Sequence, residues 1–306
     1  GVVYIGSEDS YLYAFDASSG ALLWRFHTGN VVQDAPAVVN GVIYFGSVDD
    51  NVYALDASSG AQLWSFKTNG FITYSSPAVA NGVVYIGSED NYLYALNATT
   101  GALIWRYQTG GEITSSPAVV NGVVYVGSVD SYLYAIKAKT GKFLWRYSAG
   151  HISFGINGSS PAVVNGLVYI GAGFYLSAVD AKTGALKWQY NTAGQISSSP
   201  AVAKGVVYIG SSDGKGTVYA LNATTGALKW STTVGAAIEF SSPAVANGVV
   251  YIGAFDDSIH ALKASTGKSL WSYKTTNEIQ SSPTVVNGMV FIGSLDHEVY
   301  AFSLPA

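Results

Sequence analysis

Tryptophan recurs along this chain at an almost constant spacing, and this periodicity constrains the fold more than any other feature. Consecutive tryptophans lie 40 to 43 residues apart, and seven of the eight prolines follow the same period. A period of this length indicates one supersecondary unit copied along the chain rather than a set of unrelated domains. We therefore expect a single domain over residues 1–306. The seven tryptophans are Trp24, Trp64, Trp105, Trp145, Trp188, Trp230 and Trp271.

One copy of the unit, residues 75–107, reads SSPAVANGVVYIGSEDNYLYALNATTGALIWRY. It contains four short runs rich in β-branched and aromatic residues, which is typical of strands. Asn81-Gly82 predicts a two-residue hairpin loop, and SEDN (88–91) and ATTG (98–101) predict two further turns. We expect each unit to form four antiparallel strands, numbered first to fourth, and no helix, because no apolar stripe has a period of 3.6 residues.

Four-stranded sheets repeated at this period form a β-propeller, with the first strand of each blade innermost and the fourth outermost. A solenoid is the alternative, but solenoid repeats are usually shorter and contain fewer strands. The runs add up to thirty strands, because the unit around Val2 lacks a first strand and the unit ending at 299–302 lacks a fourth. The sequence thus predicts an all-β, eight-bladed propeller with two incomplete blades at the seam. We expect a missing N-terminal segment or a partner to donate the absent strands.

Three segments carry a family resemblance: LDASSGAQLW (55–64), LNATTGALIW (96–105) and VDAKTGALKW (179–188). Together with the recurring GxVYxGSxDxxLYAL pattern, they resemble the pyrroloquinoline-quinone-type propeller repeat over essentially the whole chain. The resemblance implies that each tryptophan docks against the neighbouring blade. Its members include quinoprotein dehydrogenases, the outer-membrane barrel-assembly lipoprotein and sensor domains fused to kinases, so the fold alone does not select a function.

Composition excludes several classes of partner. Charged residues make up 11% of the chain, the net charge is −4 and there is no basic run, which argues against nucleic acid. No apolar stretch approaches the roughly 20 residues of a membrane helix, so we expect no membrane insertion. The low content of lysine and arginine, together with the family resemblance, favours a bacterial or archaeal extracytoplasmic protein.

The sequence contains no recognisable catalytic motif. The four histidines fall in different repeats without ligand spacing, and cysteine is absent. By the family resemblance, a quinoprotein enzyme would need a calcium-binding carboxylate and amide set, a catalytic aspartate and adjacent cysteines. The carboxylates here recur in seven units, three residues after the glycine that ends the second strand, which is typical of a turn cap. We expect no enzymatic activity, no cofactor and no metal.

A binding site is expected where the repeats disagree. Strand order places the fourth-to-first connections and the second-to-third turns on one face, which we call the loop face. The longest connection is 148–161, Phe174 replaces the turn aspartate, Asp34 replaces a serine of the other units, and the third residue before proline varies. Polar and aromatic groups at a channel mouth fit a small polar ligand or a peptide. The candidate binding residues are Gln33, Asp34, Tyr74, His151, Phe154, Asn157, Phe174, Glu239, Phe240 and Gln280.

Two functions remain open on the sequence. The first is a binding or sensing module whose loop face contacts a protein, peptide or glycan. The second is an assembly scaffold that uses flat faces and outer strands, as the resemblance to the barrel-assembly lipoprotein implies. A ligand at the channel mouth would favour the first, and a large exposed apolar patch on one rim would favour the second.

Overall fold

The computed structural model describes residues 1–150 and 155–303, and these form thirty β-strands in eight antiparallel sheets. Six sheets have four strands and two have three. This confirms the predicted all-β, eight-bladed propeller with two incomplete blades. No helix in the described ranges is long and apolar enough to cross a membrane. The chain forms two compact units, Gly1–Arg146 and Tyr147–Ala306, and each is described by itself.

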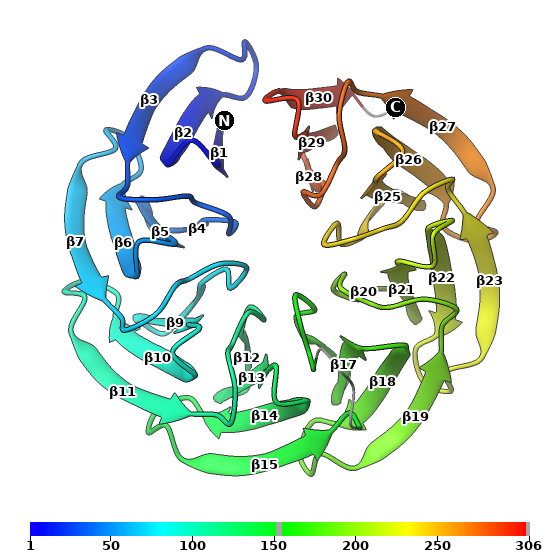
Figure 1. Cartoon of the computed structure of the whole chain (residues 1–306), viewed down its shortest axis with the longest axis horizontal. Coiled ribbons are helices and arrows are strands. Elements are labelled where there is room, and N and C mark those ends of the chain that lie inside the picture. The colour runs from blue at the N-terminus through cyan, green and yellow to red at the C-terminus, as the bar shows by residue number, and fades with distance from the viewer. Residues whose placement is uncertain (151–154, 304–306) are drawn as a thin grey trace. The chain divides into compact units, whose positions relative to one another are not determined.

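The first unit begins with a three-stranded sheet, which three four-stranded sheets follow (Figure 1). The sheets are numbered in chain order, and the last strand of the fourth sheet runs across the boundary between the units. Their strands are β1 (Val2–Gly6), β2 (Tyr11–Asp16) and β3 (Leu22–His27); β4 (Ala37–Val39), β5 (Val42–Gly46), β6 (Asn51–Asp56) and β7 (Gln62–Lys67); β8 (Ala78–Ala80), β9 (Val83–Gly87), β10 (Tyr92–Asn97) and β11 (Leu103–Gln108); β12 (Ala118–Val120), β13 (Val123–Gly127), β14 (Tyr132–Lys137) and β15 (Phe143–Ser148).

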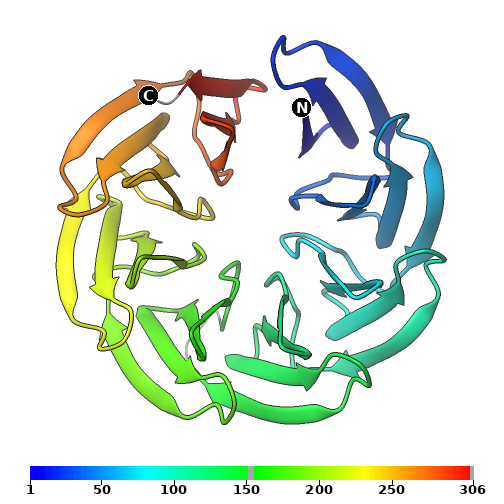
Figure 2. The same ribbon diagram turned by 180° about the vertical axis from the view of Figure 1, so that it is seen from behind.

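The second unit contains the fifth to eighth sheets, of which the eighth has three strands. Figure 2 shows the sheets from behind. Their strands are β16 (Ala162–Val164), β17 (Leu167–Ala172), β18 (Tyr175–Asp180) and β19 (Leu186–Asn191); β20 (Ala201–Ala203), β21 (Val206–Ser211), β22 (Thr217–Asn222) and β23 (Leu228–Thr233); β24 (Ala244–Ala246), β25 (Val249–Ala254), β26 (Ser258–Lys263) and β27 (Ser269–Lys274); β28 (Thr284–Val286), β29 (Met289–Gly293) and β30 (Val299–Ser303).

Short turns join the strands of each sheet in chain order. Asn81 and Gly82, between β8 and β9, have φ of 51° and 75°, the positive values that a type I′ hairpin requires. Between β6 and β7, Oδ1 of Asp56 accepts hydrogen bonds from the backbone N–H groups of Ser58 (3.1 Å) and Ser59 (2.9 Å). Hydrogen bonds from these two serines lower the pKa of Asp56 to about 2. The turn residues thus form the hairpin and the aspartate-capped turn that their side chains and backbone preferences predict.

The hydrophobic core lies between neighbouring sheets. The second and third strands supply most of it: Tyr44 of the second sheet, for example, packs in one cluster with Ile86 and Leu96 of the third. Close packing requires glycine at the end of the second strand, because a methyl group on Gly87 would lie 2.2 Å from Cγ2 of Ile113. Ile113 belongs to the connection that leads to the next sheet, so the third sheet anchors the chain that enters the fourth.

The tryptophans link adjacent sheets in each unit. The indole Nε1 of Trp64 donates to the carbonyl of Ala98 (3.0 Å), and the hydroxyl of Tyr44 donates to the same carbonyl (3.1 Å). A methyl group on Gly101 would lie 2.8 Å from the Trp64 ring, so this turn glycine permits the contact as well as the positive φ of 72°. The same indole-to-carbonyl bond is made by Trp24, Trp105, Trp188 and Trp230.

A Ser-Ser-Pro sequence precedes the first strand of six sheets, for example at 75–77, and its two serines have different structural uses. Oγ of the first serine, Ser75, accepts from the N–H of Gly87 in its own sheet (2.8 Å). Oγ of the second serine accepts from the neighbouring sheet: the N–H of Ser76 donates to Ser116 (2.9 Å) in the first unit, and the N–H of Ser160 donates to Ser199 (2.9 Å) in the second. The innermost strands are therefore tied together by side chains.

Candidate functional site

The expected loop face is present in each unit. The N–H of Val48, in the turn between β5 and β6, donates to the carbonyl of Val31 in the connection that enters that sheet (3.0 Å). In the second unit the N–H of Phe255 donates to the carbonyl of Ala237 in the same way (3.0 Å). Fourth-to-first connections and second-to-third turns therefore lie against each other, as the strand order predicted.

The repeated aspartates of the loop face hold neighbouring sheets together. Oδ1 of Asp49 accepts from the N–H of Asn51 (3.0 Å) and caps its own turn. Its Oδ2 accepts from the hydroxyl of Tyr53 (2.6 Å) and from the N–H of Gly29, in the connection from the preceding sheet (2.7 Å). Backbone groups of the preceding connection donate likewise to Asp90, Asp130 and Asp296.

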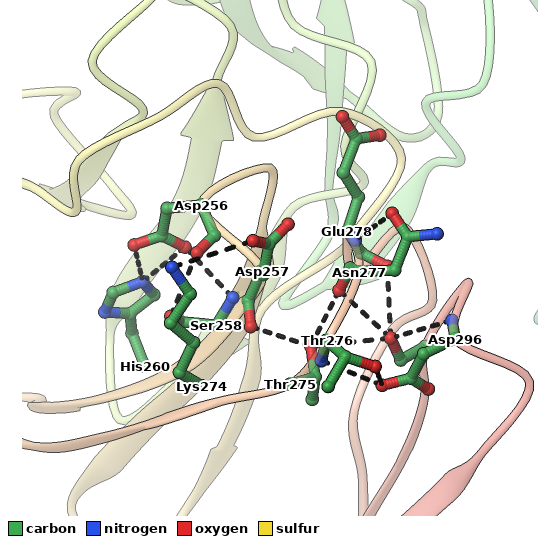
Figure 3. Close-up of polar contacts among 11 residues, drawn as sticks. Asp256, Asp257, Ser258, His260, Lys274, Thr275, Thr276, Asn277, Glu278 and Asp296 are labelled. Atoms are coloured by element: carbon green, nitrogen blue, oxygen red, sulfur yellow. Dashed lines mark hydrogen bonds and ion pairs between the residues drawn. The ribbon is translucent and has the colours of Figure 1, made fainter.

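The seventh and eighth sheets show how this network varies (Figure 3). His260 stands where every other sheet except the fifth has tyrosine, and its Nε2 lies 3.0 Å from Oδ2 of Asp256. In the next connection, the N–H of Thr276 donates to Oδ2 of Asp296 (3.0 Å). Nζ of Lys274 lies 3.8 Å from Oδ2 of Asp257. In this region His260 and Lys274 therefore lie beside aspartates, and Asp296 holds the backbone of the connection between β27 and β28.

A metal-bound quinone would need a set of convergent carboxylate and amide donors. Among residues 1–150 and 155–303, no three side chains of histidine, aspartate or glutamate gather as a metal-binding group. The aspartates of the second-to-third turns accept hydrogen bonds from their own turns, as Asp49 does from Asn51 and Asp256 from Ser258. The described residues therefore do not fit that cofactor.

Two candidates in the first unit precede β4. Gln33 is exposed, whereas Asp34 is only 5% exposed. Oδ2 of Asp34 accepts from the N–H of Gly46 (2.8 Å), which is the bond that serine makes in the other sheets. Its Oδ1 is buried without a hydrogen-bond partner among the described residues. Burial raises the pKa of Asp34 well above its ordinary range. The visible role of Asp34 is thus to replace a structural serine.

Tyr74, the third candidate of the first unit, is half-buried on an acidic part of the loop face. Burial raises its pKa, and the charges of Glu8 and Glu89 raise it further. Oε1 of Glu89 accepts from the hydroxyl of Thr73 (2.9 Å). Burial also raises the pKa of Glu89, as does the charge of Glu112. The loop face of the first unit is therefore negatively charged around one aromatic side chain.

In the second unit, Gly158 and Phe240 occupy the same position, three residues before proline, in the fifth and seventh sheets. Both have positive φ, 76° at Gly158 and 64° at Phe240. The N–H of Ser241 donates to the carbonyl of Glu239 (2.7 Å), which closes a γ-turn around Phe240. This positive-φ γ-turn is rare and strained for a residue with a side chain, at about 1–3 kcal/mol. Phe240 thus holds a conformation that suits glycine.

The strained turn places the Phe240 ring against the fifth sheet. A methyl group on Gly158 would lie 3.2 Å from Cδ1 of Phe240 and 3.0 Å from the carbonyl oxygen of Ser197. The connections that enter three successive sheets, the fifth, sixth and seventh, therefore meet at this point. Oε1 of Glu239, beside the ring, accepts from the hydroxyl of Ser212 (2.9 Å). We call Asn157, Gly158, Ser197, Glu239 and Phe240 the Phe240 cluster.

The remaining candidates lie elsewhere on the loop face. Phe174 is 51% exposed at the tip of the β17–β18 hairpin, and Gln280 is half-buried just before β28. His151 and Phe154 lie outside the described residues. The structure thus places Phe240 and Ser197 against Gly158, which follows the candidate Asn157 in the chain. Gly158 and Ser197 were not among the candidate residues. The sequence signal is one extra residue between isoleucine and Ser-Ser-Pro, which is present in the third, fifth and seventh repeats, as Tyr74, Gly158 and Phe240, and absent from the sixth.

Comparison with known proteins identifies related families and folds. The family model for the outer membrane protein assembly factor BamB matches residues 1–73, 72–214, 173–259 and 214–304. No curated protein matches the sequence. Among solved structures, BamB from Moraxella catarrhalis is 20% identical with a TM-score of 0.84, and the match covers 98% of this chain and 93% of that one.

Two other solved structures have the same fold. The computationally designed protein Ika8 is 21% identical, with a TM-score of 0.87 and coverage of 99% of this chain and 93% of its own. A quinohemoprotein alcohol dehydrogenase from Pseudomonas putida is 18% identical, with a TM-score of 0.81 and coverage of 95% and 68%. A fold shared by an assembly factor, a designed protein and an enzyme leaves the function to be argued from the site.

Proposed function

Because the chain belongs to the family of the outer membrane protein assembly factor BamB, we propose that it is a non-catalytic scaffold that binds a protein partner through the loop face of its second unit. The Phe240 cluster is the proposed contact. The family also supports an extracytoplasmic, outer-membrane-associated location as part of this proposal. The proposal involves no catalysis. Aspartates of the second-to-third turns, such as Asp49 and Asp256, accept hydrogen bonds from the backbone of a neighbouring connection or of their own turn.

The strained turn at Phe240 carries the proposal. Glycine occupies the same position in the fifth sheet with a similar φ, so the fold can adopt this conformation without strain. Phenylalanine at that position costs folding energy, and strain of this kind is characteristic of functional sites. The ring stays half-buried against Gly158 instead of entering the core. We infer that this half-buried ring anchors an apolar or aromatic side chain of the partner, a residue type that dominates protein interfaces.

The test exploits the strain. The Phe240→Gly variant should be at least as stable as the wild type, because the turn is relaxed, yet it should lose the partner. The Phe71→Gly variant is the matched control, since Phe71 is a 48% exposed phenylalanine on a connection of the first unit. Immobilised wild-type chain and both variants are incubated with an envelope extract, and the retained proteins are identified by mass spectrometry. Proteins retained by the wild type and Phe71→Gly but lost by Phe240→Gly support the proposal. Equal retention by all three contradicts it.

A second candidate contact is supported by the outer strands of the first unit. Leucine, isoleucine and phenylalanine side chains at the start of these strands are 43–53% exposed, and the Phe143 ring stacks on Tyr107 of the neighbouring sheet (6.3 Å between centroids). Exposed apolar patches of this kind mark protein interfaces. Assembly through the outer strands, as the sequence analysis allowed, would use Leu22, Leu23, Leu63, Leu103, Ile104, Phe143 and Leu144. Retention of the partner by Phe240→Gly and its loss by Ile104→Lys would favour this surface.

A further inference from the structure

Asparagine followed directly by glycine occurs eight times in this chain. This dipeptide is the most prone to spontaneous deamidation, because glycine has no side chain to shield its amide nitrogen. Two of the eight asparagines, Asn69 and Asn157, lie in connections between sheets. The other six lie in the hairpins that join first and second strands: Asn40, Asn81, Asn121, Asn165, Asn247 and Asn287. The chain therefore holds one reactive dipeptide in two kinds of backbone.

The hairpin asparagines have a backbone conformation that blocks deamidation. The reaction requires the glycine nitrogen to reach Cγ of the asparagine and close a five-membered ring. All six hairpin asparagines have φ of 50–51°. In a type I′ turn ψ of this residue is positive as well, so the glycine nitrogen points away from the asparagine side chain. In the third sheet the carbonyl of Gly82 also accepts from the N–H of Ala98 (2.9 Å). The ring can therefore close only after the hairpin opens.

Asn69 has the same neighbour in a different backbone. It lies in the connection between β7 and β8, is exposed as the hairpin asparagines are, and has no positive φ. Its N–H donates to Oδ2 of Asp90 (3.1 Å), and the carbonyl of Gly70 accepts from the hydroxyl of Thr68 (2.7 Å). The peptide group between these two anchors, like the Asn69 side chain, has no hydrogen-bond partner in the described part of the chain. It can therefore rotate and bring the Gly70 nitrogen to Cγ of Asn69 without breaking either bond.

Asn157 is the other asparagine outside the hairpins, and its surroundings are tighter. It is half-buried. A methyl group on Gly158 would lie 3.0 Å from the carbonyl oxygen of Ser197 and 3.2 Å from Cδ1 of Phe240. Packing therefore opposes rotation of the peptide group between Asn157 and Gly158. Asn69 is the asparagine that the fold leaves free to react.

We propose that Asn69 is a site of spontaneous deamidation in the folded protein. The amide nitrogen of Gly70 bonds to Cγ of Asn69, the bond from Cγ to Nδ2 breaks, and the side-chain amide leaves as ammonia with the proton of the Gly70 nitrogen. Solvent water then opens the succinimide ring at either carbonyl carbon, which gives aspartate or isoaspartate at position 69. The reaction needs no other reagent, and it is independent of the Phe240 cluster.

Modification of Asn69 changes a contact between the second and third sheets. Oδ2 of Asp90 accepts from the N–H of Asn69 and from the hydroxyl of Tyr94. A carboxylate at position 69 brings a second negative charge to Asp90, and isoaspartate adds a carbon to the backbone and so displaces the N–H. The nearby bond from the N–H of Glu89 to the carbonyl of Phe71 (2.9 Å) should then open more often.

The test ages the full chain in mildly alkaline buffer and measures aspartate and isoaspartate at all eight asparagines by peptide mapping and mass spectrometry. Because opening of a hairpin is a local unfolding step, Asn69 should deamidate at least about tenfold faster than any hairpin asparagine. Ageing in denaturant should bring the eight rates together, since the conformational difference is then lost. The amide of Glu89 should exchange hydrogen faster in the aged protein than in the fresh protein.

Two variants separate Asn69 from the hairpins. Asn69→Thr copies Thr276, whose N–H makes the same bond to Asp296 (3.0 Å), so it keeps the backbone contact and should lose most of the isoaspartate. Asn81→Lys copies Lys204, which has φ of 48° in the hairpin of the sixth sheet, and should leave the isoaspartate yield unchanged. Equal rates at Asn69 and the hairpin asparagines of the folded chain, or a faster reaction at Asn157, would overturn the proposal. So would an unmodified Asn69 in folded protein aged for as long as the denatured chain needs to react.

Discussion

The outer strands of the two units differ at one repeated position. The second residue of the fourth strand is Leu23, Leu63, Ile104 or Leu144 in the first unit, each 44–53% exposed. In the second unit the same position holds Lys187, Lys229 and Leu270. The register of the third sheet shifts there: Ala95 pairs with Trp105 and Leu96 with Leu103, so Ile104 lies in a bulge outside the pairing. The fold accepts either leucine or lysine at this position. The apolar side chains found there in the first unit are therefore not required by the fold, and they make the surface of that unit more hydrophobic.

The tryptophan contacts, by contrast, are the same in both units, and their removal should have the largest effect. Trp105→Ala and Trp188→Ala should each lower the free energy of unfolding by about 3–5 kcal/mol, because each loses a packed ring and an indole hydrogen bond to the next sheet. Urea unfolding of both variants measures this. A cost below about 1 kcal/mol in one unit would show that the sheets there are held together by other contacts.

Asp34 breaks the repeat at a buried position, and Asp34→Ser should restore it. The serine at this position accepts from glycine and can also donate, as Ser198 does to the carbonyl of Gly210 (2.9 Å), whereas a carboxylate cannot donate. At pH 8 the variant should be about 1–3 kcal/mol more stable than the wild type, because a buried oxygen without a partner is removed.

The effect of Asp34 on the free energy of unfolding should depend on pH, in a direction that follows from its pKa. Its pKa in the folded protein is raised above the ordinary 3.8, so the folded state binds the proton more tightly than the unfolded state. The contribution of protonated Asp34 to stability is present at low pH and is lost as the pH rises from 3.8 through the raised value. The advantage of Asp34→Ser over the wild type should therefore grow with pH over this interval. An advantage that stays constant between pH 4 and pH 9 would contradict the burial argument.

The extra residue before Ser-Ser-Pro is Tyr74 in the first unit and Phe240 in the seventh sheet of the second, and the two can be compared. Tyr74 occupies the inserted position of the first unit without a positive φ, whereas Phe240 has φ of 64°. Phe240→Gly should raise the free energy of unfolding by about 1 kcal/mol through relief of strain, net of the lost ring contact. Tyr74→Gly should give no such gain, because there is no comparable strain to relieve. Thermal unfolding measures the stability of both variants. A Phe240→Gly variant less stable than the wild type would show that the turn at Phe240 is not strained.

The smallest effect is expected at the bulge position itself. Ile104→Lys and Leu144→Lys copy the residues of the second unit, and each should change the free energy of unfolding by less than about 0.5 kcal/mol. Lys187→Leu is the reciprocal control. Sedimentation measures self-association, and the fluorescence of a hydrophobic dye measures exposed apolar surface. Both should fall in the two lysine variants and rise in Lys187→Leu. A large loss of stability in Ile104→Lys would show that the apolar side chain is part of the fold.

Much of the fold follows from local pattern. The strands and turns could be predicted because Asn81-Gly82 and Asp56 act through residues next to them in the chain, and the count of thirty strands depends on the same signals. The candidate site was harder to predict. Asn157, Glu239 and Phe240 stood out as departures from the repeat, but the contact of the Phe240 ring is with Gly158, which lies far from it in the sequence.

The sequence by itself determined the repeating unit, the strands, their turns and the family of this protein, because those features depend on short-range periodicity and turn chemistry. Only the tertiary structure decided which groups of neighbouring repeats contact one another. It revealed that Ser116 accepts from Ser76, that Ile113 packs on Gly87, and that Phe240 reaches Gly158 past the sixth sheet. The reason is physical: every repeat carries nearly the same groups, so the sequence cannot tell which neighbour satisfies which group. Packing of the sheets makes that choice, because it sets the few distances at which hydrogen bonds and ring contacts can form.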